Sequence, residues 1–152
     1  MVVTFRVDTS LCSLGVDESK NCLLCFSNSS NTIHLLNYSS PDMETLKMDF
    51  QSEINSIKEK WKETAKDVVP IRVSFNVERG LIVTGLSNGG FVVRRIRFQE
   101  KISSELVLVG KLRGSAPITF IDYVSDYDMM ISGGCDGICR IMDKISQKDS
   151  FK

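Results

Sequence analysis

The chain has 152 residues and carries 19 basic and 19 acidic side chains, so its formal net charge at neutral pH is zero. This balance argues against a general nucleic-acid binder, because affinity for phosphates requires clustered positive charge. The length fits one domain, and the apolar fraction of 42% and charged fraction of 25% are those of an ordinary globular protein.

The N-terminus and the cysteines predict a cellular compartment. The first eight residues lack the basic start, apolar stretch and cleavage site of a secretion signal. No apolar run approaches the roughly 20 residues that a membrane-spanning helix needs. The five cysteines are an odd number and lie scattered among apolar runs, which is not the spacing of a disulfide framework. We therefore expect reduced thiols, a cytoplasmic location and no membrane span.

Strand patterns occupy most of the chain. Short apolar or alternating stretches are separated by polar turns, which predicts β-strands. The expected strands are residues 2–7, 11–16, 22–26, 32–38, 44–50, 71–77, 81–84, 91–98, 105–110 and 118–124, and the two arms of a hairpin within 129–143.

One segment has a helical period instead. Three apolar residues recur at helical spacing with charged residues between them: Ile54, Ile57 and Trp61. Ser52 suits the N-cap position, and Glu53 is favourable in a first helical turn. The pattern predicts a single inserted helix over about 53–66.

Three turns rich in Ser, Thr, Asn and Gly indicate an internal repeat. The turn Ser132-Gly-Gly-Cys-Asp-Gly137 contains Asp-Gly between two apolar runs, which is a strong hairpin signal. A similar turn, Thr84-Gly-Leu-Ser-Asn-Gly89, begins 48 positions earlier, and a shorter one begins at Ser27, 57 positions before that. The larger spacing corresponds to the inserted helix. Each unit has about four short strands, and such units at this period are typical of propeller blades.

The last unit resembles the WD-repeat β-propeller family. Its sequence Ile131-Ser-Gly-Gly-Cys-Asp-Gly-Ile-Cys-Arg-Ile-Met-Asp143 follows the family signature Ser-Gly-x-x-Asp-Gly-x-hydrophobic-x-hydrophobic-Trp-Asp, with Met142 in the place of the Trp. The Gly-His dipeptide of the signature is missing, since His34 is the only histidine. The buried Asp–His–Ser/Thr–Trp hydrogen-bond network of the family therefore cannot be assembled.

The resemblance implies an all-β fold, a partial β-propeller of about three four-stranded antiparallel blades with one inserted helix. The expected blades cover about 11–51, 71–112 and 118–145, and a polar tail follows at 146–152. Strand 2–7 is expected to complete the third blade. Because propellers typically have four to eight blades, three arrangements remain open. They are a fragment or short isoform of a longer propeller, an open stack of sheets, and two chains in a six-bladed ring.

No residue pattern typical of an enzyme is present. Cys22 and Cys25 have the spacing of a metal or redox pair, but residues three apart on a strand point to opposite faces. His34 lies between apolar residues of an expected strand. The glycines between Gly85 and Gly90 form a turn between strands, not a phosphate-binding loop that opens a helix. We therefore expect a chain that is not an enzyme and holds no metal or cofactor.

The expected function is a non-enzymatic scaffold for protein–protein interaction. Its partners would be other proteins, a second propeller fragment or a second copy of the chain, and no nucleic acid. The candidate partner-binding residues come from the inserted helix, the basic strand and the turns: Trp61, Arg95, Arg97, Asn88 and Asp136. Simpler explanations are helix packing for Trp61, a solvated strand edge for the arginines, and turn formation for Asp136.

A looser likeness gives an alternative function. Some propellers catalyse guanine nucleotide exchange on small GTPases during vesicle trafficking from the endoplasmic reticulum. They are similar in having degenerate blades and a long insertion before the first strand of a blade, as residues 51–70 would be here. Their glycine-rich N-terminal loop and membrane anchor have no counterpart in this sequence.

Overall fold

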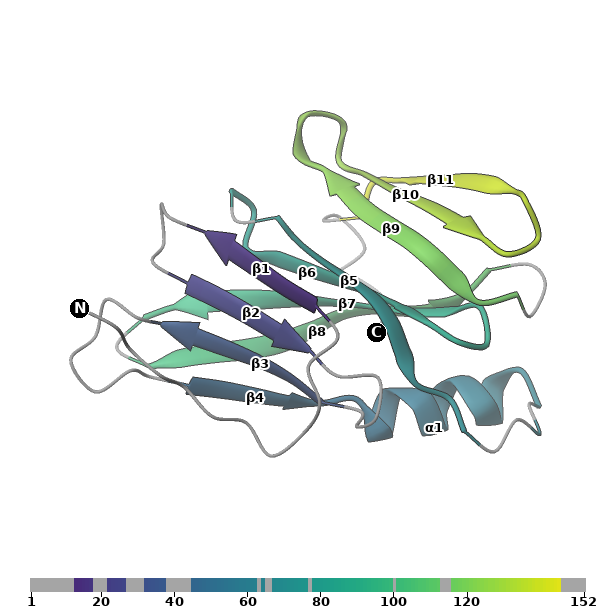
Figure 1. Cartoon of the computed structure of the whole chain (residues 1–152), viewed down its shortest axis with the longest axis horizontal. Coiled ribbons are helices and arrows are strands. Elements are labelled where there is room, and N and C mark those ends of the chain that lie inside the picture. The colour runs from purple at the N-terminus through teal and green to yellow at the C-terminus, as the bar shows by residue number, and fades with distance from the viewer. Residues whose placement is uncertain are drawn as a thin grey trace.

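The computed structural model describes residues 13–17, 22–26, 32–37, 45–62, 64, 67–76, 78–99, 101–112 and 116–145. Within these residues, strands form three antiparallel sheets, and an α-helix lies between the first and second sheets along the chain (Figure 1). The prediction of an all-β chain with one inserted helix is confirmed. The described strands do not close into a ring.

The strands follow one another in sequence order within each of the first two sheets. The first sheet has the order β1-β2-β3-β4, with β1 Ser13–Asp17, β2 Cys22–Phe26, β3 Thr32–Asn37 and β4 Thr45–Asp49. The second has the order β5-β6-β7-β8, with β5 Pro70–Asn76, β6 Leu81–Leu86, β7 Gly90–Phe98 and β8 Ile102–Lys111.

The third sheet has three described strands, β9 Ile118–Val124, β10 Met129–Gly134 and β11 Cys139–Asp143. A short 3-10 turn, Ser125–Tyr127, joins β9 to β10. The antiparallel hairpin expected between residues 129 and 143 is confirmed. The expected strand 2–7 and the polar tail 146–152 lie outside the described residues.

Strand β8 begins at Ile102, three residues before the predicted start at 105. Ser103 and Ser104 give no apolar signal, yet they pair with Arg97 and Ile96 of β7. Cross-strand pairing therefore extends the strand beyond the hydrophobic pattern, as strand formation depends on the neighbouring strand more than on local sequence.

Helix α1, Gln51–Lys60, begins two residues earlier and ends six residues earlier than predicted. At the start, Phe50 and not Ser52 is the N-cap residue, and the backbone N–H of Gln51 donates to Asp49 Oδ1 at 2.8 Å. The end differs because Lys62 has a left-handed backbone, with φ of 52°. Residues 62–66 also contain no large apolar side chain that would hold another turn against the sheets.

The second sheet is the middle layer of the molecule. One of its faces packs against the first sheet and α1, and the opposite face packs against the third sheet. On the first face, its buried residues are Ile82, Leu86, Val92, Ile96 and Ile102. On the second face, they are Leu81, Val83, Phe91, Val93 and Val107. Every residue of β6 is buried, which is the pattern of a strand covered on both sides.

Neighbouring sheets also meet along their first strands. Strand β5 borders both β1 and β9 (Figure 1). Ser74 Oγ on β5 donates to Asp122 Oδ1 on β9 at 2.5 Å, and Asn76 Nδ2 donates to the carbonyl oxygen of Tyr123 at 3.3 Å. The second and third sheets are therefore joined by hydrogen bonds at one edge and by apolar packing across their faces.

One buried ion pair holds α1 on the second sheet. The Arg94 guanidinium of β7 contacts the Glu53 carboxylate of the helix, and the two side chains are only 14% and 4% exposed. The same guanidinium donates to the backbone oxygen of Asp49 and to Ser104 Oγ, at 3.2 Å each, and lies 5.1 Å from the centroid of the Phe50 ring. Arg94 thus joins the end of β4, the helix and β8.

Two buried hydroxyls occupy equivalent positions of the repeat. Thr84 on β6 and Ser132 on β10 are 48 positions apart, and each begins one of the similar turns. Both residues are buried, and neither hydroxyl oxygen has a hydrogen-bond partner among the described residues. A buried hydroxyl without a partner costs free energy relative to an apolar group of the same shape.

The substitution Thr84→Val should raise the free energy of unfolding by about 1 kcal/mol, because it replaces the hydroxyl with a methyl group of similar size. Urea denaturation of both proteins measures the difference. Thr119→Val, at an exposed position of β9, is the control and should change stability by less than about 0.5 kcal/mol. A Thr84→Val protein less stable than the parent would show that this hydroxyl makes a hydrogen bond.

The substitution Glu53→Ala should lower the free energy of unfolding by about 3 kcal/mol, because it leaves the Arg94 charge buried without its carboxylate. Glu105→Ala is the control. It removes a carboxylate from an exposed ion pair with Arg97, which should cost less than about 1 kcal/mol. Equal losses in the two variants, measured by urea denaturation, would contradict a structural role for the buried pair.

Candidate partner-binding surfaces

Arg95 and Arg97 are both bonded to one acidic residue of the next strand. Arg97 Nη2 and Nε donate to the two carboxylate oxygens of Glu105 at 2.6 and 3.1 Å, and Arg95 Nη1 lies 3.5 Å from Oε1. The register of β7 and β8 sets this arrangement, since Arg95 stands directly opposite Glu105. The two arginines and Glu105 therefore form one ion-paired group across the two strands.

Asn88 lies inside its turn. The residue is buried, and its Oδ1 accepts a hydrogen bond from the backbone N–H of Gly90 at 3.0 Å. The neighbouring Ser87 exchanges two hydrogen bonds with the backbone of Val69, which comes from the segment before β5. The turn after β6 is thus covered by the chain itself, and Asn88 stabilises its backbone.

Asp136 is at the exposed tip of the β10–β11 hairpin. Its Oδ2 accepts from Arg140 Nη2 at 2.6 Å, and its Oδ1 accepts from the backbone N–H of Ile138 at 3.1 Å. The Arg140 hydrogen bond, followed by the Ile138 hydrogen bond, lowers the pKa of the Asp136 carboxyl below its ordinary value of 3.8. These bonds explain Asp136 as a residue that stabilises the hairpin.

Trp61 differs from the other two apolar residues of its helical stripe. Ile54 and Ile57 are fully buried against the sheets, whereas Trp61 is 37% exposed at the end of α1. Lys60 Nζ lies 4.8 Å from the centroid of the indole ring. The helix therefore packs through its two isoleucines and presents the indole at the molecular surface.

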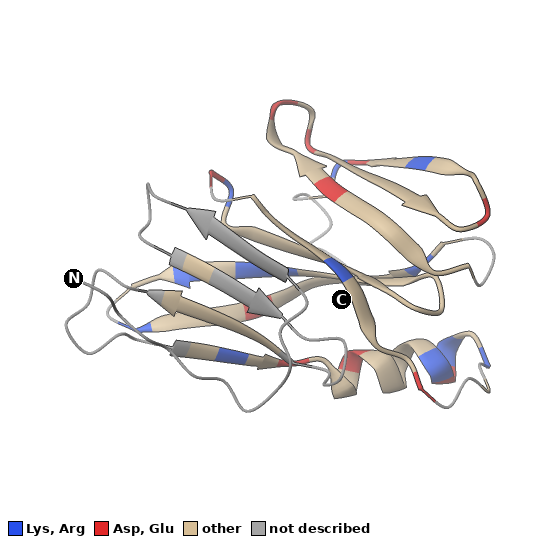
Figure 2. Ribbon diagram, in the orientation of Figure 1, with Lys and Arg blue, Asp and Glu red and all other residues tan. Residues whose placement is uncertain are grey.

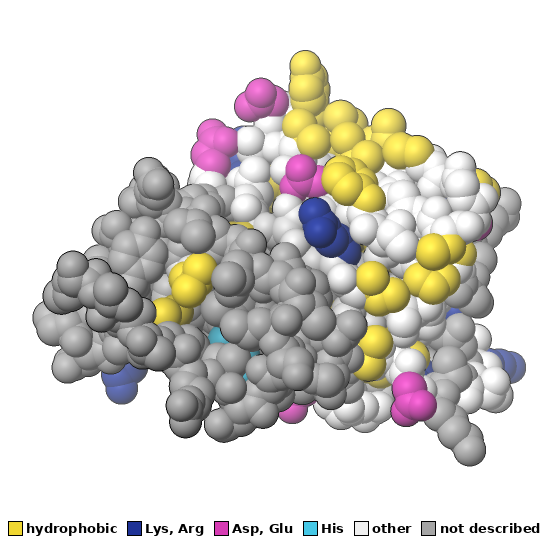
Figure 3. All heavy atoms as spheres, in the orientation of Figure 1, with side chains coloured by type: hydrophobic (Ala, Val, Ile, Leu, Met, Phe, Trp, Pro, Cys, Tyr) yellow, Lys and Arg dark blue, Asp and Glu magenta, His cyan; other side chains and the backbone are white. Residues whose placement is uncertain are grey.

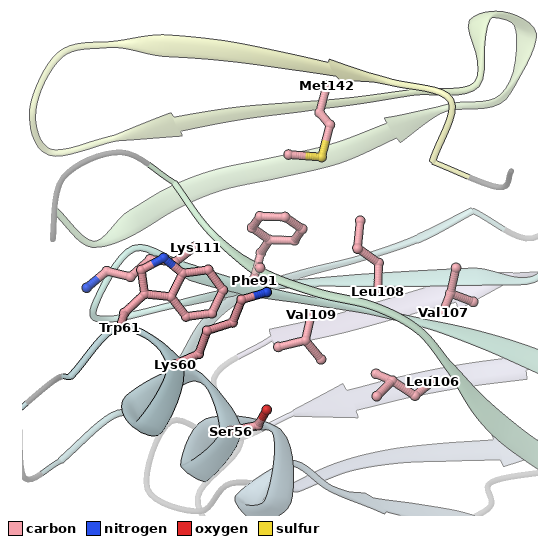
Figure 4. A pocket seen from close by; sticks show the side chains of 11 residues that line it. Ser56, Lys60, Trp61, Phe91, Leu106, Val107, Leu108, Val109, Lys111 and Met142 are labelled. Atoms are coloured by element: carbon pink, nitrogen blue, oxygen red, sulfur yellow. The ribbon is translucent and has the colours of Figure 1, made fainter. Parts of the chain in front are cut away.

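Trp61 borders an apolar groove of about 660 Å³ between α1, β8 and β11 (Figure 4). Strand β8 forms its floor, with the helix end on one side and Met142 of β11 on the other. The lining residues are Ser56, Lys60, Trp61, Phe91, Leu106, Val107, Leu108, Val109, Gly110, Lys111 and Met142. Leu106 is 50% exposed, so both Trp61 and Leu106 leave substantial apolar surface in contact with water.

The outer face of the third sheet is a second apolar surface. Cross-strand pairing places Phe120, Gly133 and Cys139 in one row across this face, and Asp122, Ile131 and Ile141 in the next. Phe120 is 48% exposed and Ile141 is 65% exposed. Figure 3 shows hydrophobic side chains gathered over β9–β11, at the top of the view. The opposite face of the same sheet is covered by the second sheet.

Comparison with known proteins assigns no family to the chain. No protein-family model matches the sequence, and no curated protein matches it. The described residues define a mostly β protein of three antiparallel sheets with one helix. No helix among them is long and apolar enough to cross a membrane.

Sequence reasoning missed the exposed apolar residues of both surfaces. Leu106, Phe120 and Ile141 lie in apolar strand patterns, which the sequence analysis interpreted only as strands. An apolar residue on a strand gives the same signal whether a neighbouring sheet covers it or not.

The stabilisation from Asp136 should depend on pH. Because its folded-state pKa is lowered, the carboxylate stabilises the hairpin above the unfolded-state pKa, and this contribution is lost as the pH falls through the folded-state pKa. The stability difference between the parent and Asp136→Asn should therefore be largest near neutral pH and shrink in acid. Urea denaturation at several pH values measures this difference.

A titration of the Asp136 carboxyl carbon by NMR provides the direct check. Arg140→Gln should move its midpoint up towards 3.8, since the largest cause of the lowered pKa is removed. An unchanged midpoint in Arg140→Gln would contradict the role of the arginine.

Proposed function

We propose that the chain is a non-enzymatic protein-binding scaffold built of propeller-like blades, and that the outer face of its third sheet docks an antiparallel sheet of a partner protein. The observation that carries the proposal is a correspondence between two sheet faces. One is the face of the second sheet that the third sheet covers. The other is the outer face of the third sheet, which the described residues leave uncovered.

The correspondence follows the 48-residue repeat. Val83 and Val93 of the second sheet are fully buried under the third sheet. The residues 48 positions later are Ile131 and Ile141, which are apolar as well, and Ile141 is largely exposed. The same type of side chain therefore occupies equivalent positions, but the covering sheet is present only in the first case.

A pair of glycines marks the same difference. A Cβ atom on Gly85 of the second sheet would lie 2.6 Å from the Ile118 side chain of the third sheet, so only glycine permits the observed approach. Gly133 is the equivalent position 48 residues later, and a Cβ atom there would meet only Phe120 of its own sheet, at 3.8 Å. The outer face thus keeps the small residue that a further sheet would require, without such a sheet packed on it.

The stacking order supports blades as the building units. The first strand of the second sheet, β5, borders both β1 and β9, and the sheets pack face to face in sequence order. In a propeller, four-stranded sheets are arranged around an axis, consecutive sheets pack face to face, and the first strand of each sheet is nearest the axis. A partner sheet on the outer face would continue the same series.

The chemistry of the partner follows from the existing interface. The third sheet covers the second with Ile118, Ile121, Tyr123 and Met130, all buried. The partner is therefore an antiparallel sheet of another polypeptide with an aliphatic and aromatic face. The exchange-factor alternative stays a second hypothesis, which an assay of nucleotide release from a small GTPase would test.

Ile141→Lys should weaken partner binding, since it places a charge on the apolar face, next to Ile131 of the central strand β10. Protein captured from cell extract, followed by crosslinking and mass spectrometry, identifies partners and the segments in contact. Partners of the parent chain should crosslink to residues 118–143 through a strand segment of their own, and Ile141→Lys should reduce their capture about tenfold or more.

Tyr127→Lys is the matched control. Tyr127 is 70% exposed, similar to Ile141, but lies in the turn between β9 and β10. Equal capture by Ile141→Lys and Tyr127→Lys would overturn the proposal. Sedimentation of the purified chain adds a further check, because a dimer dissociated by Ile141→Lys would make the occupant a second copy and not another polypeptide.

A further inference from the structure

Strand β8 is a long sheet edge that runs along the apolar groove. Among the described strands it pairs only with β7, so its other edge carries backbone N–H and C=O groups outside any strand ladder. The register with β7 shifts beside Val93 and Arg94, which leaves Val107 as an extra residue in the middle of β8. An extended chain can pair with such an edge, which is a common way for sheets to bind peptides.

The groove supplies side-chain contacts along this edge. Figure 4 shows Trp61 and Lys60 at the end of α1, Leu106 and Val109 on the helix side of β8, and Met142 across the groove. The six residues from Leu106 to Lys111 span about 17 Å. An extended segment of about six residues therefore fits beside them, with alternate side chains towards Trp61 and towards Met142.

The charge of the groove indicates the chemistry of that segment. Among the described residues, the lining contains Lys60 and Lys111 and no acidic side chain. Lys58 lies in the last turn of α1 and Lys62 follows the helix, and Figure 2 marks basic residues in blue along this end of the ribbon. Lysines on sheet edges can also discourage strand pairing. Here, however, they are at one end of the groove, and the apolar stretch of β8 from Leu106 to Val109 lies beyond them.

We propose that the groove binds an extended segment of a partner protein, which adds as a strand to the edge of β8. Apolar side chains of the segment contact Trp61 and Leu106, and an acidic side chain contacts Lys60 at the helix end. The inference deepens the proposed protein-binding function, but its surface is separate from the outer face of the third sheet. Ile141→Lys should therefore leave peptide binding unchanged, so the two proposals fail independently.

Synthetic peptides test the proposal directly. The probe is acetyl-Thr-Val-Thr-Leu-Thr-Val-Asp-Asp-amide, together with a panel in which the acidic pair occupies each position in turn. Trp61 is the only tryptophan of the chain, so its fluorescence reports on the groove. We expect at least one panel member to release heat in titration calorimetry and to shift the Trp61 emission to shorter wavelength.

Two altered peptides distinguish strand addition from non-specific hydrophobic binding. Replacing both aspartates with lysine should weaken binding at least tenfold, because the helix end is basic. Methylation of alternate backbone nitrogens should also weaken binding at least tenfold, because it removes the donors that pair with β8. No binding by any panel member at millimolar concentration would overturn the proposal, as would equal affinity for the lysine or N-methylated peptides.

Two charge-reversal variants complete the test. Lys60→Glu should weaken binding of the aspartate peptide about tenfold and improve binding of the lysine peptide. Lys101→Glu, at an exposed position before β8 that does not line the groove, should leave both affinities unchanged. Both side chains are exposed, so neither variant should unfold the chain. Equal effects of the two substitutions would show that the helix end has no specific role.

Discussion

The burial of the second sheet on both faces is the constraint on which the rest of the molecule depends. Strands β6 and β7 carry apolar residues towards both sides, so a layer is needed on each. The first sheet with α1 supplies one layer and the third sheet supplies the other. The third sheet, in contrast, is covered on only one face by the described residues, although its outer face carries Ile131 and Ile141 where the covered face of the second sheet carries Val83 and Val93. The apolar docking surface is a direct consequence of this uneven coverage.

Several charged residues, including three of the candidate partner-binding residues from the sequence analysis, form ion pairs within the molecule. Arg94 holds the helix through Glu53, Arg95 and Arg97 are bonded to Glu105, and Asp136 is bonded to Arg140. Ion pairs of this kind stabilise the fold locally and leave little charge for a partner. The surfaces that remain available are apolar: the outer face around Ile141 and the groove around Trp61 and Leu106. The case for partner binding therefore rests on the uncovered apolar area more than on charge.

Apolar packing holds the second and third sheets together across their faces. The buried hydroxyls of Thr84 and Ser132 have no hydrogen-bond partner among the described residues. Aliphatic side chains pack face to face instead, and Gly85 permits the close approach of Ile118. Such packing is non-directional, which is compatible with accepting a further sheet that is not identical in sequence.

The sequence by itself determined most of the strands, the inserted helix and the hairpin at Asp136, because apolar periodicity and turn residues are local signals. It misplaced the ends of the helix, since the N-cap is Phe50 and not Ser52 and Lys62 has a left-handed backbone. It also shortened β8, since Ser103 and Ser104 become strand through pairing with β7. Only the tertiary structure decided which candidate residues are exposed. Asn88 is buried, whereas Trp61 is partly exposed. Exposure depends on which other segments pack over a residue, and the hydrophobic pattern of one segment contains no information about those segments.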